Sequence, residues 1–279
     1  MPESLRVLAA VLVLALALGC EREATAPAAV PSPAPDPQLA ADLELVRAAR
    51  VLFAHAAEDA GLLAGVARLP EPSLRVVALG AGADEPLPAA SLSHVAFGPD
   101  GEPAAKIAAF EERLDAEPQP GADVALLELS CGDLNPETDT KALFTHYREA
   151  IERLKRAHPR TVFVHVTAPL GVRDTGAVDL LKRLMRFSDG RAQANVRRDE
   201  YNGRLRAAFR GQPIFDLAAL ESLWPDGRAE RFTRGDMSHP SLVPAYSEDG
   251  CRLTSLGQDR AARALIHALA DALRAHPPH

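Results

Sequence analysis

Short apolar runs that alternate with longer segments of helical period constrain the fold of this chain more than any other feature. The runs are rich in aliphatic and β-branched residues, as buried parallel strands are. The expected strands are residues 50–54, 74–79, 123–129, 161–166 and 213–217. This pattern predicts the α/β class, with a doubly wound parallel sheet between two helix layers, a three-layer α/β/α arrangement.

Helices are expected between these runs. Apolar residues recur at helical spacing within 39–49, within 138–157 and near the C-terminus at Leu265, Ile266, Leu269 and Leu273. Residues 39–279 are therefore predicted to form one domain. In open parallel sheets the sites lie at the carboxyl ends of strands. The loops that begin at His55, Ser130, Thr167 and Ala218 are the places to look for chemistry.

Charge and motif content narrow the function classes. The formal net charge is −7, and the chain has no basic block of the kind that binds a phosphate backbone. We expect no nucleic-acid partner. The His and Cys residues lack the paired spacing of a metal site, and Gly80-Ala81-Gly82 is too short for a phosphate loop. Neither a metal nor another cofactor is expected.

The N-terminus indicates export. Arg6 precedes an apolar run that is too short to span a bilayer, followed by Gly19 and Cys20. The stretch ALGC resembles a bacterial lipobox, so residues 1–20 are predicted to be a lipoprotein signal peptide and Cys20 the lipidated residue. Ordinary secretion with cleavage after Ala17 is the alternative.

Residues 21–38 are rich in proline and alanine, which favours an extended polyproline II tether. At about 3.1 Å per residue, such a tether reaches up to about 50 Å from a membrane. We expect a lipoprotein of the cell envelope, anchored in the membrane by its N-terminal lipid.

Seven segments, in order, resemble a bacterial branch of the SGNH (GDSL-like) hydrolases. They are VLFAHAAEDAGLLAG, EPAAKIAAFE, DVALLELSCGDL, HYREAIERLKRAHPRTVFVHVTAPL, NVRRDEYN, PIFDLAALES and AYSEDGCRLTSLG. The resemblance runs from about Val51 to about Leu273 and implies a flavodoxin-like SGNH hydrolase fold.

Two catalytic positions of that family are vacant here. Ala57 stands where the family has its nucleophilic Ser, and Arg252 stands where it has its general base His, while the orienting Asp is kept as Asp249. A methyl group cannot attack a carbonyl, and a guanidinium cannot accept a proton at neutral pH. The resemblance therefore predicts a hydrolase-like domain without the catalytic pair.

Other polar residues at the strand ends are candidates for a pocket. The expected pocket residues are His55, Ser130, Cys131, Asp133, Arg198, Asn202 and His239. Arg198, Tyr201 and Asn202 are expected to buttress a helix against the sheet, His55 to be a structural residue, and His239 to lie in a polar loop with Ser238 and Ser241.

The cysteines add a further expectation. If Cys20 carries lipid, Cys131 and Cys251 remain in a compartment that permits disulfides. By the resemblance both lie at the catalytic centre, where a bridge would close over the vacant site. Two free thiols, or a nucleophilic Cys131, are the alternatives.

These features favour an inactive SGNH-like lipoprotein that binds an envelope glycan, an acylated polymer or a protein. The alternatives are an active ester hydrolase that uses displaced groups such as Ser130, Cys131, His55 or His239, and a purely structural envelope lipoprotein.

Overall fold

The computed structural model describes residues 36–56, 61–70, 74–80, 86–116, 121–173 and 190–276. All of them belong to one compact unit, which spans Pro33–His279. The predicted signal peptide, the predicted lipidation site Cys20, most of the predicted tether and Ala57, at the predicted nucleophile position, lie outside the described residues.

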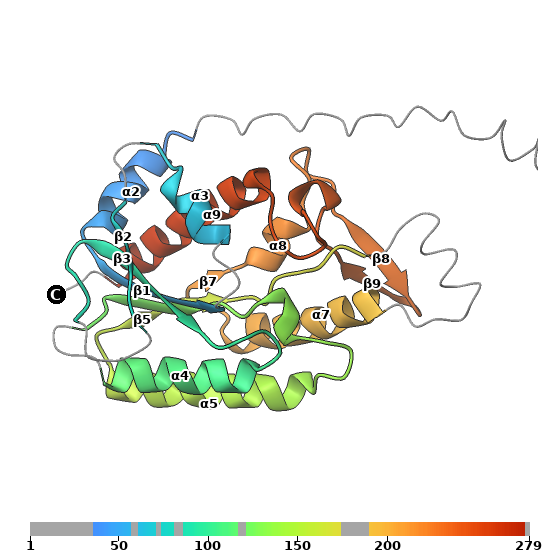
Figure 1. The fold of residues 1–279 in the computed structure, drawn as a ribbon, viewed down its shortest axis with the longest axis horizontal. Helices are drawn as coiled ribbons and strands as arrows, with labels where there is room; N and C mark the ends of the chain where they lie inside the picture. Colours follow the sequence, from blue (N-terminus) through green and yellow to red (C-terminus); the bar gives the residue numbers. More distant parts are fainter. Residues whose placement is uncertain are drawn as a thin grey trace, which may run out of the picture. The chain divides into compact units, whose positions relative to one another are not determined.

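A parallel sheet forms the middle of the molecule (Figure 1). Five strands follow the order β2-β3-β1-β4-β5, and every pair is parallel. The backbone N–H of Val164 donates to Ala125 O at 3.0 Å, so β5 and β6 continue one another beside β4, and β6 pairs in parallel with β7. The strands are β1 Arg50–Ala56, β2 Val76–Ala78, β3 Ser91–Phe97, β4 Val124–Leu127, β5 Val162–Phe163, β6 His165–Val166 and β7 Ile214–Phe215.

This order is the flavodoxin-like order 2-1-3-4-5 with β2 added at one edge. The predicted α/β class is thus confirmed. Each predicted run holds a strand, but β3 was not predicted, because Ser91, Ser93 and His94 interrupt its apolar pattern. The last run ends early, since Asp216 caps the following helix by accepting a hydrogen bond from the N–H of Ala219.

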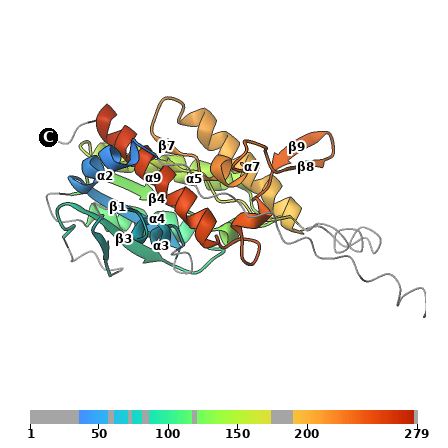
Figure 2. The same ribbon diagram turned by 90° about the horizontal axis from the view of Figure 1, so that it is seen from above.

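Helices cover both faces of the sheet (Figures 1 and 2). Alternate side chains of β1 enter opposite cores: Val51 and Phe53 pack with α2, α3 and α9, whereas Leu52 and Ala54 pack with α4, α5 and α7. The helices are α2 Leu39–Arg47, α3 Gly61–Ala67, α4 Pro103–Asp115, α5 Thr140–Ala157, α7 Gly190–Ala208, α8 Leu217–Glu221 and α9 Ser255–Ala275. None of the described helices is long and apolar enough to cross a membrane.

An ionic cluster joins the start of the domain to its last helix. His267 of α9 lies between two carboxylates, with Nδ1 2.5 Å from Asp42 Oδ2 and Nε2 2.6 Å from Asp36 Oδ2. Arg274 donates to the other oxygen of Asp42, whose side chain is fully buried. We name Asp36, Asp42, His267 and Arg274 the α2–α9 clasp. It fixes the first described residues of the chain to the body of the domain.

Candidate functional site

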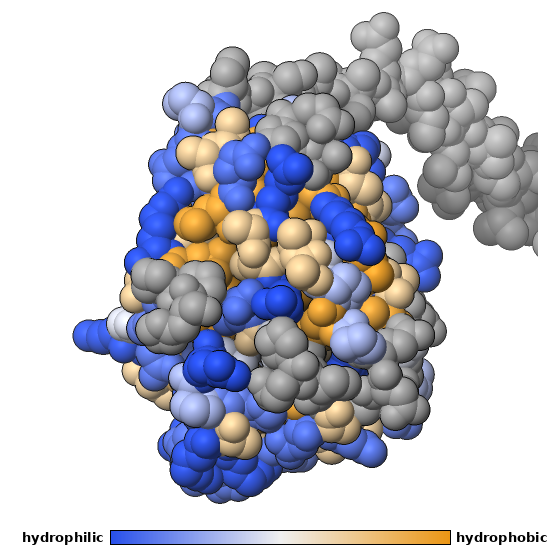
Figure 3. Space-filling model, turned by 90° about the vertical axis from the view of Figure 1, so that its left-hand side faces the viewer, coloured by the Kyte–Doolittle hydropathy of each residue, from blue (hydrophilic) through white to orange (hydrophobic). Residues whose placement is uncertain are grey.

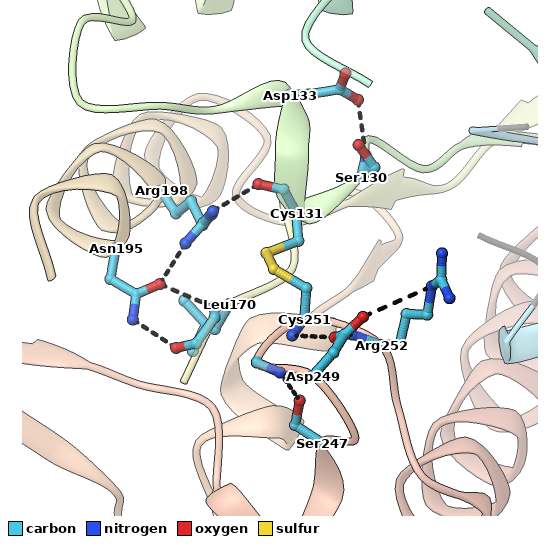
Figure 4. Close-up of a disulfide and its surroundings, with 12 residues drawn as sticks. Ser130, Cys131, Asp133, Leu170, Asn195, Arg198, Ser247, Asp249, Cys251 and Arg252 are labelled. Atoms are coloured by element: carbon cyan, nitrogen blue, oxygen red, sulfur yellow. Dashed lines mark hydrogen bonds and ion pairs between the residues drawn. A yellow bond between two sulfur atoms is a disulfide. The ribbon is translucent and has the colours of Figure 1, made fainter. Parts of the chain in front are cut away.

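A disulfide joins two loops at the carboxyl edge of the sheet (Figure 4). Cys131 begins the short 3₁₀ helix η1 (Cys131–Asp133), which follows β4, and Cys251 lies in the loop that leads to α9. The bond closes a separation of 120 residues, with the Cα atoms 5.9 Å apart. Neither sulfur is therefore available as a nucleophile while the bond is intact.

The loop that carries Cys251 is built around Asp249. Its Oδ1 accepts the backbone N–H groups of Cys251 at 2.9 Å and Arg252 at 2.8 Å, and these bonds hold the pKa of Asp249 below its ordinary value. Gly250 has a φ of +107°, which favours glycine, and a Cβ there would lie 2.7 Å from Nη1 of Arg191. The turn before the disulfide thus requires a residue without a side chain.

Arg252, which the resemblance places at the base position, does not face the disulfide. Its side chain is 64% exposed, and its Nε lies 3.8 Å from Asp249 Oδ2. In Figure 4 the guanidinium points away from the two sulfurs. Asp249 therefore lies near a permanent cation rather than a proton acceptor.

Helix α7 clamps the loop after β6 through two asparagines. Asn202 exchanges hydrogen bonds with the backbone N–H and C=O of Ala168 at 2.7 and 2.9 Å, and Asn195 does the same with Gly171 at 2.9 and 2.6 Å. Asn195 precedes Asn202 by seven residues, so both amides lie on one helix face. The buttress role expected for this helix describes Asn202 well. No role was predicted for Asn195 from the sequence, although its spacing of seven residues from Asn202 places both on one helix face.

Arg198, from the same face of α7, reaches the disulfide loop. Nη1 donates to Asn195 Oδ1 at 2.6 Å and Nη2 donates to the carbonyl of Cys131 at 2.5 Å (Figure 4). Burial lowers the pKa of the Arg198 guanidinium to about 10, which leaves it charged at neutral pH. A buried positive charge thus stands beside the disulfide.

A pocket of about 230 Å³ opens at this place. Of the predicted pocket residues it contains Cys131 and Arg198, together with Asp249 and Cys251. His55, Ser130, Asp133, Asn202 and His239 do not line it. Its lining is Cys131, Gly132, Leu134, Asn135, Pro136, Gly171, Val172, Gly190, Arg191, Ala194, Arg198, Asp249, Gly250 and Cys251.

Asp133 serves the structure instead. Both of its oxygens lie 2.8 Å from Nζ of Lys106, and both side chains are fully buried. It also accepts the backbone N–H groups of Gly101 and Ser130 at 3.0 and 2.8 Å. With its lone pairs engaged, Asp133 holds the loop after β3 against η1, which corrects its expected place in the pocket.

The two candidate histidines have partners elsewhere. His55 lies within β1, with Nδ1 2.7 Å from Ala56 O and Nε2 3.0 Å from His94 Nδ1. Burial and the neighbouring His55 lower the pKa of His94. The sequence predicted a polar loop for His239. The structure places this residue instead in the hairpin of β8 (Arg231–Arg234) and β9 (Met237–Pro240), where its Nδ1 lies 2.9 Å from Asp199 Oδ2. Among the hydrogen bonds between described residues, none joins a Ser or Cys side chain to a histidine.

The opposite edge of the sheet also has a cavity, of about 1050 Å³, beside the starts of β1, β4 and β5. Apolar side chains gather in the centre of the face that Figure 3 shows, with hydrophilic ones around them. Near this edge the imidazole of His165 stacks on Phe209, with ring centroids 3.6 Å apart, and lies 3.0 Å from Tyr147 Oη. Burial and the charge of Lys155 lower the pKa of His165 to about 3, so this imidazole is neutral.

Metal ligation has no support in the described part of the chain, where no three His, Cys, Asp or Glu side chains are grouped to hold an ion.

Comparisons with known proteins give structural matches alone: no family model and no curated protein matches the chain. A lipolytic protein of the G-D-S-L family from Desulfitobacterium hafniense is 8% identical, with 78% of this chain and 99% of that chain covered and a TM-score of 0.43. The periplasmic domain of the lipopolysaccharide acetyltransferase of Salmonella ser. Paratyphi A is 13% identical, with 80% of this chain and 84% of that chain covered and a TM-score of 0.38. The OSK domain of Drosophila Oskar is 14% identical, with 78% of this chain and 86% of that chain covered and a TM-score of 0.41. Solved structures similar to this chain thus include a protein of the GDSL type, the family that its sequence resembles, and at these scores they carry no argument about its function.

Proposed function

We propose that this chain is an inactive, membrane-tethered SGNH hydrolase-like domain that binds an envelope glycan, an acylated polymer or a protein without turning it over. The observation that carries the proposal is the occupation of the carboxyl edge by the Cys131–Cys251 disulfide, with the exposed Arg252 at the family's base position. A binding pocket remains beside the disulfide, because its walls do not depend on the missing catalytic side chains.

The chemistry of the missing pair supports inactivity. Ala57 lacks a nucleophilic atom and Arg252 cannot take up a proton at neutral pH. In hydrolases that rely on a nucleophile and a base, loss of either one costs on the order of a millionfold in turnover. Binding and oxyanion contacts alone leave roughly a thousandfold over water.

Displaced catalytic groups receive little support from the geometry. The thiol of Cys131 is bonded to Cys251, and the imidazoles of His55 and His239 lie against His94 and Asp199. Ser130 is buried, and its backbone N–H is bound by Asp133. An active esterase would have to reduce the disulfide, or bring a serine hydroxyl to a histidine that no hydrogen bond between described residues joins to it.

The experiment measures hydrolysis of 4-nitrophenyl acetate by the wild type, by Ala57→Ser, by Arg252→His and by the double variant. We expect rates at the buffer level for the wild type and both single variants. The double variant is expected to gain activity, because only it has a nucleophile and a base at the two positions that the family uses. The control is Ala57→Ser with Arg204→His, which adds the same two groups but places the histidine on the exposed Arg204 of α7.

Wild-type turnover above buffer would overturn the proposed inactivity. A gain in the control equal to that of the double variant would show that the position of Arg252 has no special geometry.

Membrane tethering is a separate part of the proposal and rests on Cys20 and the proline-rich residues 21–38. A protein with several acyl chains stays on a membrane far more firmly than one with a single chain. Cys20→Ser is expected to move the protein from the membrane fraction to the soluble fraction. A soluble wild type whose mature N-terminus is Leu18 would favour ordinary secretion instead.

A further inference from the structure

The pocket beside the disulfide has a buried cation in its wall. Arg198 is 6% exposed, and its side chain makes two hydrogen bonds, one to Asn195 and one to the carbonyl of Cys131. A guanidinium has five N–H donors. Within the described part of the chain its buried Nε has no hydrogen-bond partner. Most of the donor capacity of Arg198 is thus not used by the described residues.

The charge of Arg198 is only partly balanced. No ion pair between described residues includes it, and the carboxylate that acts on it is Glu221, which already accepts the backbone N–H of Leu170 at 2.6 Å. Asp249 also lines the pocket, but two backbone N–H groups and Arg252 share its oxygens. Arg191 adds a second positive charge to the lining.

The remaining wall lets a ligand come close to the backbone. Gly132, Gly171, Gly190 and Gly250 line the pocket, so part of its wall consists of main chain. A Cβ on Gly171 would lie 3.1 Å from Nη1 of Arg198, which shows how near this wall is to the cation. The volume of about 230 Å³ is below the range of about 300–1,000 Å³ that suits drug-sized ligands. The pocket therefore fits one small unit of a larger molecule.

The geometry points to a binding site for the carboxylate of an acidic sugar unit, held by Arg198 and Arg191 in the pocket beside the disulfide. This inference rests on the proposed binding function and names its ligand class. A guanidinium suits a carboxylate because its planar donors match the two oxygens. A neutral sugar would leave the buried charge of Arg198 only partly balanced by Glu221.

The test compares D-glucuronate with D-glucuronamide, its neutral isostere, by NMR titration of the oxidised, isotope-labelled domain. The amide signals of Gly171 and Gly250 report binding at this place. We expect glucuronate to bind about tenfold more tightly than glucuronamide, as for a hydrogen bond with charged partners. Arg191→Gln should weaken glucuronate binding by roughly fivefold.

Two pairs of variants keep the test specific. Ala194→Leu, on the pocket wall, is expected to abolish the shifts, whereas Ala207→Leu on the exposed side of α7 should leave them unchanged. Arg204→Gln removes an exposed charge from the same helix and serves as the control for Arg191→Gln.

Equal binding of the two sugars, or no binding of glucuronate, would overturn the inference, and so would shifts that Ala194→Leu leaves in place. None of these outcomes tests the proposed inactivity, which is tested by the ester assay. Ester turnover together with selective glucuronate binding would instead overturn the inactivity and support the acidic ligand.

Discussion

The disulfide at the carboxyl edge and the α2–α9 clasp both join parts of the chain that are far apart in sequence, but by opposite means. Cys131 and Cys251 are 120 residues apart and are joined by a covalent bond. Asp36 and His267 are 231 residues apart and are joined by a hydrogen bond between ionisable groups. The first connection responds to reductants and the second to pH.

The two connections also differ in their position relative to the pocket. The clasp joins Asp36, near the end of the predicted tether, to the last helix, and none of its four residues lines the pocket. The disulfide stands inside the pocket wall. A change that opens the clasp should therefore alter stability without altering binding, whereas loss of the disulfide should alter both.

The largest effect is expected from Cys131→Ser with Cys251→Ser. The closed loop restricts the unfolded chain, so its loss is expected to reduce the free energy of unfolding by about 2–5 kcal/mol. Urea denaturation measures this change. Reductant should destabilise the wild type by a similar amount and leave the double variant unaffected; an equal loss in both would locate the effect elsewhere.

A smaller loss is expected from Asp42→Asn. Burial would raise the pKa of Asp42, but hydrogen bonds from His267 and Arg274 outweigh it and hold this pKa below its ordinary value. Removing the buried charge should cost about 2 kcal/mol of unfolding free energy. Asp271→Asn, which affects only an exposed carboxylate beside Arg274, is the control and should have little effect. Equal losses would mean that burial of Asp42 does not matter.

The clasp also predicts a pH dependence. Burial by itself would lower the pKa of His267, but hydrogen bonds to Asp42 and Asp36 and their charges raise it above its ordinary value of 6.5. A raised pKa in the folded state means that the stabilisation is complete below about 6.5 and is lost as the pH rises through the folded value. At still lower pH, protonation of Asp36 and Asp42 also removes this stabilisation. Their pKa values are lowered, so this loss requires acid.

We therefore expect the difference in unfolding free energy between the wild type and His267→Gln to be larger at about pH 6 than at about pH 9. Denaturation at both pH values measures it, and Arg274 stays charged throughout. A difference that grows with pH would contradict the assignment of the imidazole as the charged partner in the clasp.

The smallest effect is expected from Arg252→Ala. The side chain is mostly exposed, and its contact with Asp249 spans 3.8 Å. Exposed ion pairs contribute little to stability. Neither the unfolding free energy nor glucuronate binding should change measurably; a large loss of binding would place Arg252 in the pocket after all.

Much of the fold was predictable, because strands and helices repeat with different periods. The run at 50–54 lies within β1, the run at 123–129 contains β4, and the helical period at 138–157 contains α5. Strand β3 was missed because its polar residues Ser91 and Ser93 bond to each other inside the sheet, at 3.0 Å between hydroxyl oxygens. Such pairing depends on tertiary contacts that single-sequence patterns do not carry.

The site was only partly predictable, because some of its contacts depend on residues that are distant in the sequence. Cys131, Arg198 and Cys251 were singled out from the sequence, and the structure brings them together at one pocket. The partners of Asp133 and His239, which are Lys106 and Asp199, come from other elements 27 and 40 residues away. No spacing within a local motif predicts those pairs, so both residues were expected in the pocket although they stabilise its surroundings.

The most direct test of the proposed inactivity is intact-mass analysis of the oxidised protein after incubation with an activated acyl ester, with the released alcohol measured in parallel. We predict no enzyme-bound acyl group and no release above buffer. A single acyl group on one serine or cysteine, together with continued release of the alcohol, would contradict the account and identify the nucleophile that it excludes.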